Sequence, residues 1–245
     1  MSELKIDPDN KFDIPKNLNV TGFVHGKNNT IEIGDVEIPS TVTLKIFGNN
    51  NHIKIDSIFC TKALDIRIGV KESLVSNNCK IHFGKNFWSE SNLQLLLYNH
   101  ENKLDVGDDC LFSNNITIRL GDRPHLIFDS TTGEYTDISD GVFIGDHVWV
   151  GEAVYITKNV TIPNDCILAI KSVVTKRFEE TNCVIAGNPA EVVKKNVQWI
   201  RNKSERFLKS DSKYKISYDK YEEDNKYEKT KTNNTTTHSS ITRNH

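Results

Sequence analysis

A six-residue repeat between residues 141 and 176 constrains the fold of this 245-residue chain more than any other feature. Apolar residues recur at every sixth position, and small or β-branched residues stand two positions before each of them. The two series are Ile144, Val150, Ile156, Ile162, Leu168 and Val174, and Val142, Val148, Val154, Val160, Cys166 and Ser172. This period matches neither a helix nor a half-buried strand, which repeat at about 3.6 and about 2 residues. It is typical of a parallel β-helix, in which three units complete a triangular coil and equivalent apolar side chains stack inward.

Residues 21 to about 102 carry a less regular version of this pattern. Short alternating runs are separated by corners rich in Asn and Gly, and Asn tolerates left-handed backbone angles. The alternation places these pairs inward: Ile31 and Ile33, Leu44 and Ile46, Ile53 and Ile55, Ile66 and Ile68, and Ile81 and Phe83. We interpret the region as imperfect early coils with bulged corners. The alternative is an unrelated antiparallel β-domain.

A gap in the repeat predicts a projecting loop. Val106, Phe112 and Ile118 are six residues apart, but the next residue in register is Ile144. A segment within residues 119–140 must therefore leave the coil, and long loops in compact repeats usually carry function. His125 lies in this segment, and an imidazole is the best general base near neutral pH. The alternative is an exposed histidine without a role.

The remaining boundaries follow from composition and spacing. Residues 1–20 are polar and predict an extended lead-in, and the β-helix is expected over 21–190. Apolar residues at helical spacing predict a C-terminal helix over 191–209, which would cover the open end of the coils. Residues 210–245 have almost nothing apolar to bury, so we expect a disordered polar tail.

Charge and cysteine usage narrow the partners and the compartment. The net charge of −2 offers no electrostatic case for nucleic acid or an anionic membrane. The N-terminus has no apolar core of a signal peptide, and no apolar run is long enough to span a bilayer. The five cysteines are scattered, and Cys110 and Cys166 stand at inward positions, as buried hydrophobes in a reducing cytoplasm would.

The motifs GVFIGDHVWVG, SVVTK and CVIAGNPAEVV resemble the hexapeptide-repeat acyltransferases. The 24-residue spacing from His125 to Trp149, the Asn-rich early coils and the CVIAG-x-PA segment resemble, in particular, the polysialic-acid capsule O-acetyltransferases. The resemblance covers about residues 25 to 205. It implies a left-handed β-helix, a homotrimer, and acetyl-CoA as the acyl donor. It implies no metal; a carbonic-anhydrase-like zinc enzyme would need three converging histidines, and no third stands near His125 and His147.

The same resemblance implies roles for individual residues. His125, Ile127, Phe128 and Asp129 match the pattern H-x-I-aromatic-D, although Pro124 precedes the histidine where many relatives place proline after it. His125 would then be the general base, and Asp122 or Asp129 could orient it. Trp149 opposes the inward residues, so it points outward. Its indole N–H or a backbone N–H would stabilise the oxyanion, or it would be an interface tryptophan without catalytic role. We assign His147 to the subunit interface or a polar rim.

The donor groove is implied by the same family. Pantetheine would run between adjacent coils, Thr175 and Lys176 would meet the nucleotide end, and Asn188 and Pro189 would lie near adenine. The remaining positions carried over to the groove are Gly151, Glu152, Ala169 and Ile170. Many relatives have GAGS where this chain has Ala-Ile-Lys-Ser at 169–172, so two bulkier residues stand there.

These features predict an acetyl-CoA-dependent O-acetyltransferase that acts on a bacterial surface polysaccharide, with sialic-acid-containing capsule as the nearest comparison. His125 would remove the proton of the acceptor hydroxyl, whose oxygen would attack the thioester directly, since no cysteine lies in the loop. Two alternatives stay open: an acetyltransferase of a small sugar or nucleotide-sugar, and a non-catalytic β-solenoid binding module. The sequence does not identify the acceptor sugar or its hydroxyl.

Overall fold

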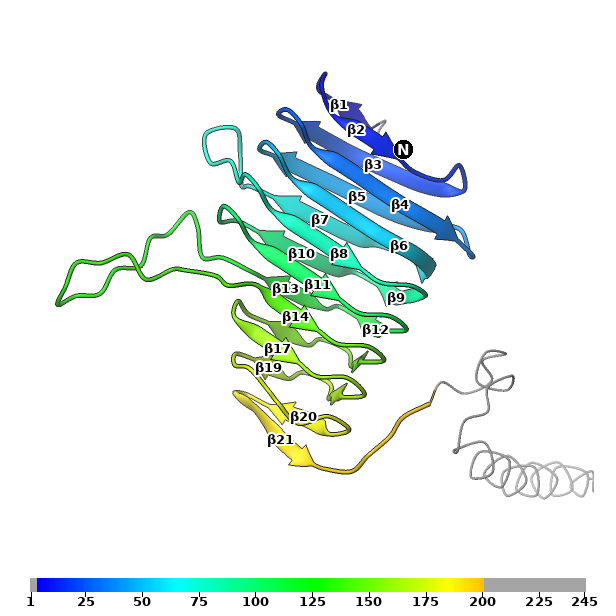
Figure 1. Ribbon diagram of the computed structural model, residues 1–245, viewed down its shortest axis with the longest axis vertical. Coiled ribbons are helices and arrows are strands. Elements are labelled where there is room, and N and C mark those ends of the chain that lie inside the picture. Colours follow the sequence, from blue (N-terminus) through cyan, green and yellow to red (C-terminus); the bar gives the residue numbers. More distant parts are fainter. Residues whose placement is uncertain (1–3, 201–245) are drawn as a thin grey trace, which may run out of the picture. The chain divides into compact units, whose positions relative to one another are not determined.

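The computed structural model of the protein describes residues 4–200. Within them, parallel strands wind into a left-handed β-helix whose coils stack along one axis (Figure 1). Strands of successive coils pair through backbone hydrogen bonds, because a parallel pair is completed when the chain returns one coil later in the same direction. The predicted fold class is confirmed.

The strands form three faces, which the chain visits in the order face 1, face 2 and face 3. Face 1 holds β2 (Lys11–Asp13), β4 (Thr30–Val36), the start of β6 (His52–Thr61), β8 (Lys80–Phe83), β11 (Lys103–Val106), β14 (Val142–Ile144) and β17 (Val160–Ile162). Face 2 holds the end of β6, β9 (Phe87–Ser91), β12 (Leu111–Asn114), β15 (Trp149–Val150), β18 (Ile167–Leu168) and β20 (Val184–Gly187). Face 3 holds β1 (Lys5–Ile6), β3 (Leu18–His25), β5 (Ser40–Phe47), β7 (Leu64–Ile68), β10 (Leu93–Leu97), β13 (Thr117–Arg119), β16 (Tyr155–Ile156) and β19 (Val173–Val174). The last strand, β21 (Ala190–Lys194), pairs with β20 in the antiparallel sense.

The coils shorten along the chain. Leu44 of β5 pairs with Ile66 of β7, which lies 22 residues later. Val142 of β14 pairs with Val160 of β17, which lies 18 residues later, the length of three six-residue units. The longer early coils explain why their apolar residues do not recur in sixes. Because the early strands pair in parallel, the alternative of an antiparallel β-domain is excluded.

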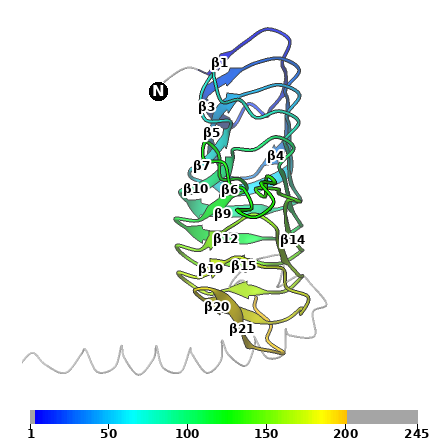
Figure 2. The same ribbon diagram turned by 90° about the vertical axis from the view of Figure 1, so that its left-hand side faces the viewer.

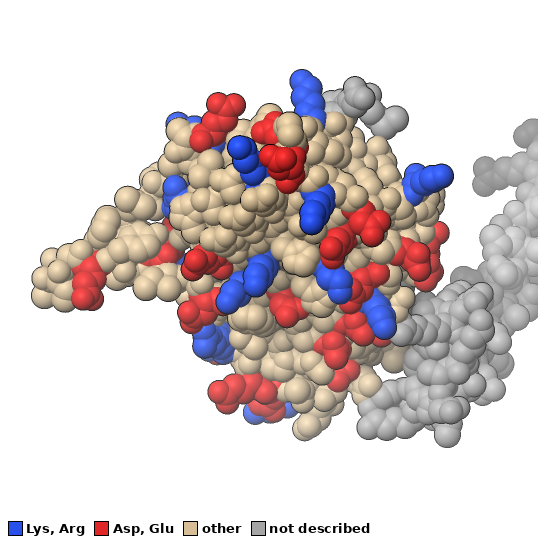
Figure 3. All heavy atoms as spheres, turned by 45° about the horizontal axis from the view of Figure 1, so that its top comes forward, with Lys and Arg blue, Asp and Glu red and all other residues tan. Residues whose placement is uncertain are grey.

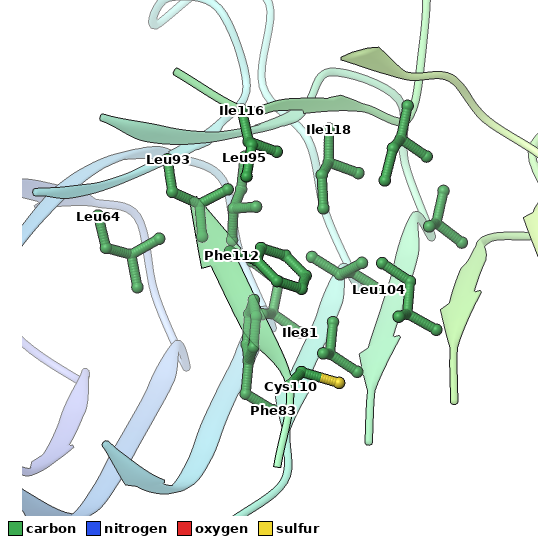
Figure 4. Packing of buried hydrophobic residues seen from close by; sticks show 14 of the residues in the cluster. Leu64, Ile81, Phe83, Leu93, Leu95, Leu104, Cys110, Phe112, Ile116 and Ile118 are labelled. Atoms are coloured by element: carbon green, nitrogen blue, oxygen red, sulfur yellow. The ribbon is translucent and has the colours of Figure 1, made fainter. Parts of the chain in front are cut away.

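The core fills the interior of the coils (Figure 4). Every residue that the six-residue repeat and the early alternation placed inward is buried. Three phenylalanines occupy the middle coils, with ring centroids of Phe83 and Phe87 4.4 Å apart and those of Phe87 and Phe112 5.3 Å apart. The inward ladders predicted by the sequence are therefore the core of the protein.

Asparagines build the corner between face 3 and face 1. Asn28 and Asn50 adopt positive φ angles of 55° and 57°. Beside them, Asn51 Nδ2 donates to Asn29 Oδ1 at 2.9 Å, and Asn51 Oδ1 accepts from the backbone N–H of Cys79 at 2.9 Å. An amide side chain is both donor and acceptor, so this buried ladder satisfies backbone groups that the corner leaves without strand partners.

The β-helix differs from the sequence prediction at both ends. Its strands begin at β1 and β2, which pair in parallel with β3 and β4, so residues 5–13 already form coil where we expected a lead-in. At the other end, the predicted helix over 191–209 is wrong for its described part. Residues 190–194 form β21, because a hairpin with β20 pairs the exposed edge of the last coil (Figure 2). Residues 201–209 and the tail at 210–245 lie outside the described residues.

Charges of both signs are interspersed on the face shown in Figure 3. Some charged side chains of the described residues pair along one strand, as Lys54 does with Asp56 at 2.8 Å and Arg67 with Asp65 at 2.6 Å. Such exposed pairs contribute little stability each. The view shows no large region of a single charge, in keeping with the net charge of −2.

Candidate active site

The long loop leaves the β-helix at the corner between face 3 and face 1 (Figure 1). β13 ends at Arg119 and β14 begins at Val142, so the loop lies within the range that the gap in the repeat predicted. Its two arms run side by side, since Phe128 and Tyr135 form an antiparallel bridge and their rings meet edge to face at 5.7 Å. The loop is a ribbon that projects into solvent.

His125 lies on the outgoing arm of this ribbon and is exposed. The Arg123–Pro124 peptide bond directly before it is cis. The backbone N–H of His125 donates to the carbonyl of Asp122 at 3.2 Å. Among residues 4–200, no group forms a hydrogen bond with its imidazole, so both ring nitrogens are open to a reactant. A ring with a free nitrogen is what a general base requires.

The two carboxylates that could orient His125 are engaged elsewhere. Asp129 Oδ1 accepts from the backbone N–H groups of Thr131 and Thr132, both at 2.8 Å, and these bonds hold the pKa of Asp129 below its usual value. Asp122 Oδ2 accepts from Lys158 Nζ at 2.8 Å. In this structure Asp129 shapes the ribbon tip, and Asp122 belongs to the base of the loop.

A buried polar cluster at the loop base was missed by sequence reasoning. Asp137 is 2% exposed, and its carboxylate contacts Asn99, Tyr135, Lys158 and the backbone N–H of Asp122. Buried carboxylates require partners of this kind. The sequence shows that Lys158 stands at a coil corner, directly before Asn159. It does not show that this lysine contacts the loop.

Trp149 points outward from β15 on face 2, and it is 38% exposed. Its indole Nε1–H donates to Ser113 Oγ at 3.4 Å, a long bond that a reactant could replace. The ring of Trp199 lies 6.1 Å away and stacks on His147 at 4.0 Å, while Asp165 Oδ1 lies 2.9 Å from His147 Nδ1. His147, at the turn directly before β15, is thus fixed by Asp165 and Trp199.

Trp199 itself was not identified from the sequence, because residues 191–209 had been interpreted as a helix. It is 8% exposed, and its Nε1–H donates to the carbonyl of His147 at 2.9 Å. Burial of a tryptophan with a satisfied N–H anchors the segment that follows β21 against face 2. The segment therefore lies beside Trp149.

Six of the predicted donor-binding residues lie together at the corner between face 2 and face 3: Gly151, Glu152, Ala169, Ile170, Asn188 and Pro189. Hydrogen bonds donated by backbone N–H groups stack the successive corners. Gly151 N–H donates to the Leu168 carbonyl at 2.8 Å, Lys171 N–H to the Glu152 carbonyl at 2.8 Å, and Gly187 N–H to Ser172 Oγ at 3.2 Å. We call these six residues the donor column.

Close packing at the donor column explains the glycine at its start. A Cβ atom at Gly151 would lie 2.7 Å from the Leu168 carbonyl oxygen and 2.8 Å from the Ile170 nitrogen. Ile170, one of the bulkier residues at this corner, is 60% exposed, so its side chain projects outward. Trp149 stands two residues before Gly151, which places the outward indole at one edge of the column.

Thr175 and Lys176 lie elsewhere. They follow β19 and are exposed at the corner between face 3 and face 1, across face 3 from the donor column. Lys176 Nζ pairs with Glu191 of β21 and lies 5.5 Å from the centre of the Phe178 ring. Thr175 and Lys176 thus lie at a different corner from the other predicted donor-binding residues, and only the Lys176 side chain reaches back toward them, through Glu191.

His125 and Trp149 also lie on different sides of the coil. The loop leaves the corner between face 3 and face 1, and Trp149 lies on face 2. In a triangular coil that corner is opposite to face 2, and in Figure 1 the loop projects to one side while β9 and β12 of face 2 lie toward the other. The two residues do not come together within one chain.

The cysteines do not contribute a nucleophile to either side. All five are buried and unpaired as disulfides. Burial raises the pKa of Cys79, Cys110 and Cys166 to about 12. A thiol of such high pKa is almost fully protonated at neutral pH and is a poor nucleophile. The expectation that Cys110 and Cys166 pack as small hydrophobes is confirmed.

Residues 4–200 contain neither a metal-binding group nor a membrane-spanning helix. No three His, Cys, Asp or Glu side chains in this part of the chain are grouped to hold a metal ion. The same residues contain no helix long and apolar enough to cross a membrane.

The left-handed β-helix of hexapeptide coils is the fold of the hexapeptide-repeat acetyltransferases. No family model matches the sequence. The polysialic acid O-acetyltransferase of Neisseria meningitidis, however, is 31% identical over 195 residues, which are 72% of this chain and 87% of that protein. The chain belongs to the family of the polysialic acid O-acetyltransferases, as its motifs predicted.

Solved structures agree. The polysialic acid O-acetyltransferase OatWY superposes with a TM-score of 0.62 at 28% identity, covering 88% of this chain and 96% of that one. The polySia-specific acetyltransferase NeuO superposes with a TM-score of 0.63 at 23% identity, covering 88% and 90%. At this identity the match with NeuO shows the common fold. The coverage extends the likeness through the irregular early coils.

Proposed function

We propose that this protein transfers acetyl from acetyl-CoA to a hydroxyl of a sialic-acid-containing capsular polysaccharide. One observation carries the proposal: a relative that acts on polysialic acid matches this chain over 87% of its own length. The match covers both the regular coils and the early ones, so it is more than a shared repeat. The acceptor named for that relative is the best guide to the acceptor of this chain.

Two residues of the chain supply the groups that a direct transfer needs. His125, whose imidazole is unengaged, takes the proton of the acceptor hydroxyl, and the freed oxygen forms a bond to the thioester carbonyl carbon. The Trp149 indole N–H stabilises the oxyanion that develops there. When the carbon–sulfur bond breaks, the imidazolium returns its proton to the leaving sulfur, so the acetyl ester and free coenzyme A are formed.

The donor column fits the narrow pantetheine arm of acetyl-CoA. Its coils are held at fixed spacing by hydrogen bonds, and the glycine at 151 lets the next coil pack closely against it, so the column presents a regular surface. Lys176 supplies positive charge for phosphate at the far corner. Its pair with Glu191 is exposed, with side-chain exposures of 46% and 60%, so phosphate can replace Glu191 at little cost.

We propose a homotrimer in which the ribbon of one copy lies against face 2 of the next. Leu126, Ile127 and Phe128 on the ribbon are 58%, 47% and 53% exposed, and Trp149 is exposed on the opposite side of the coil. Apolar side chains at two such places favour cover by a second copy. His125 of one copy would then work beside Trp149 of its neighbour, which no single chain achieves.

The compartment proposed is the cytoplasm. All five cysteines are free, including Cys166 and Cys183, whose sulfur atoms lie 3.6 Å apart without a bond. Thiols at such a distance persist where the surroundings are reducing.

The acetyl transfer is tested with purified protein, acetyl-CoA and a panel of acceptors: sialic acid polymers, short sialic acid oligomers, free sialic acid and neutral capsular polysaccharides. Release of coenzyme A thiol reports turnover, and NMR locates the new ester. We expect thiol release with sialic acid polymers and none with neutral polymers. Turnover confined to free sugars would instead support the small-sugar acetyltransferase.

The shared site is tested by complementation. His125→Ala and Trp149→Ala should each be nearly inactive alone. Coexpressed, they should form mixed trimers in which some sites combine an intact His125 with an intact Trp149, and a measurable part of the activity should return. If mixed trimers form but stay inactive, His125 and Trp149 of neighbouring copies do not share a site, and this arrangement is wrong.

A further inference from the structure

We propose that Asp137 and Lys158 are positioning residues that hold the ribbon and thereby set the place of His125. The inference rests on the proposed function, because it takes His125 as the base. Neither residue touches the imidazole. Both act through Asp122, which lies on the same arm as His125.

Asp137 ties the two arms of the ribbon together. It lies on the returning arm, and its side chain is fully buried although the neighbouring residues of the tip are exposed. Its Oδ2 accepts from the backbone N–H of Asp122 on the outgoing arm at 3.1 Å and from the Tyr135 hydroxyl at 3.2 Å. One carboxylate thus joins the arms at the point where they leave the coil.

The same carboxylate is bound to the coils on both sides of the loop. Asn99, which follows β10 in the preceding coil, donates from Nδ2 to Asp137 Oδ2 at 2.6 Å and to the Asp137 carbonyl at 3.1 Å. Lys158, which follows β16 in the next coil, pairs with Asp137 Oδ1. The base of the ribbon is thus held by side chains of two coils, which fixes the direction in which the ribbon leaves the β-helix.

Asp122 connects this set of contacts to His125. Lys158 Nζ also donates to Asp122 Oδ2 at 2.8 Å. The carbonyl of Asp122 accepts from the backbone N–H of His125 at 3.2 Å. A shift of Asp122 therefore moves the backbone of the base, and positional errors of about 1 Å in a catalytic group can cost about a hundredfold in rate.

Packing leaves little freedom at this point. A Cβ atom at Gly121 would lie 2.5 Å from the side chain of Asn99, so the outgoing arm passes directly over that amide. Burial alone would raise the pKa of Asp137, but bonds from Asn99 and Lys158 and from the Asp122 backbone outweigh it and keep the pKa below its usual value. The carboxylate is ionised at neutral pH and keeps its partners.

The variants that test this role are Lys158→Met, which removes the charge, Lys158→Arg, which keeps it, and Asp137→Asn. Lys54→Met is the matched control, because it breaks the ion pair of Lys54 with Asp56 on β6, away from the loop. Each is assayed for kcat, for the KM of acetyl-CoA, and for amide hydrogen exchange over residues 121–138. Wild type and His125→Ala are assayed beside them.

We expect Lys158→Met and Asp137→Asn to lower kcat about tenfold to a hundredfold with the KM of acetyl-CoA unchanged, and to speed exchange of the Asp122 and His125 amides. Lys158→Arg should restore most of kcat, and Lys54→Met should match wild type. A merely structural role would lower the active fraction and leave the exchange of these two amides in the folded protein unchanged.

The outcomes separate this inference from the proposed function. If wild type transfers acetyl, His125→Ala does not, and Lys158→Met keeps wild-type kcat, the positioning role is wrong while the function stands. If wild type transfers no acetyl to any acceptor, the proposed function is wrong. Amide exchange then still shows whether Lys158 and Asp137 hold the loop in place. Unchanged exchange at Asp122 and His125 in Lys158→Met would overturn the positioning role.

Discussion

At the corner between face 2 and face 3, successive coils are joined by backbone hydrogen bonds, whereas at the corner between face 3 and face 1 charged side chains hold the loop. The first corner repeats: Gly151, Ala169 and Gly187 each lie there, one coil apart. The loop base at the second corner is built once, by the amide of Asn99 and the charged side chains of Asp137 and Lys158. Both corners belong to the same coils and carry residues of the same proposed reaction.

The difference reflects what each corner has to hold. A donor that is the same in every turnover suits a rigid column made by the repeat itself, because backbone bonds leave few alternatives. A base on a ribbon needs a fixed exit direction, and only side chains from neighbouring coils can provide it once the strand pairing stops. The loop corner should therefore be the more sensitive to charge changes, and the column to changes of shape.

The largest effect is expected at His125 on the outgoing arm of the loop. His125→Ala removes the proposed base, so kcat should fall by at least about a hundredfold. The fold should persist, because His125 is exposed and its imidazole has no partner among residues 4–200. Thiol release measures kcat, and circular dichroism checks the fold. Wild-type activity in the purified variant would show that another group is the base.

On the opposite side, Trp149→Phe keeps an aromatic ring and removes the indole N–H. If that N–H stabilises the oxyanion, kcat should fall by about a hundredfold while the KM of acetyl-CoA changes little. Ser113→Ala is the control, since it removes only the present partner of the indole. An unchanged kcat in Trp149→Phe would leave the tryptophan with a role in the interface alone.

A smaller effect is expected at Lys176, which stands apart from the donor column. Lys176→Glu replaces attraction to phosphate by repulsion and should weaken acetyl-CoA binding by about 1 kcal/mol, or about fivefold, at this exposed site. Glu191→Gln is the matched control, because it frees Lys176 from its pair and should leave binding equal or tighter. Calorimetric titration measures both. Equal affinity of wild type and both variants would show that Lys176 does not contact the nucleotide end of acetyl-CoA.

The smallest effect is a difference in acid response between the two corners. The pKa of Asp137 is lower in the folded protein, so its partners stabilise the loop base above its usual pKa of 3.8, and this contribution is lost as pH falls through the lowered value. Amide protection at Asp122 should therefore fall in acid before protection at Gly151, whose bond joins two backbone groups. Simultaneous loss at both amides would mean that the loop base has no separate acid response.

Much of the fold could be predicted because the repeat itself sets which residues face the interior of the coils. Ile144, Val150 and Ile156 are inward in any coil of three six-residue faces, and all three are buried. The early pairs such as Leu44 and Ile46 follow from alternation alone. Over its described residues, 191–200, the predicted C-terminal helix was wrong for a physical reason. Spacing within residues 191–209 favoured it, but β21 pairs with the unpaired edge of β20, which local spacing does not reveal.

The candidate site divides in the same way. By itself the sequence determined the parallel β-helix through its period, the position of the loop through a gap, and the outward direction of Trp149 through alternation, because these are properties of residues close in the chain. Only the tertiary structure decided that His125 and Trp149 lie on opposite sides, that Trp199 packs on His147, and that Asp137 meets Lys158. Those contacts join residues from different coils, and whether they meet depends on coil lengths of 18 to 38 residues that only the folded register sets.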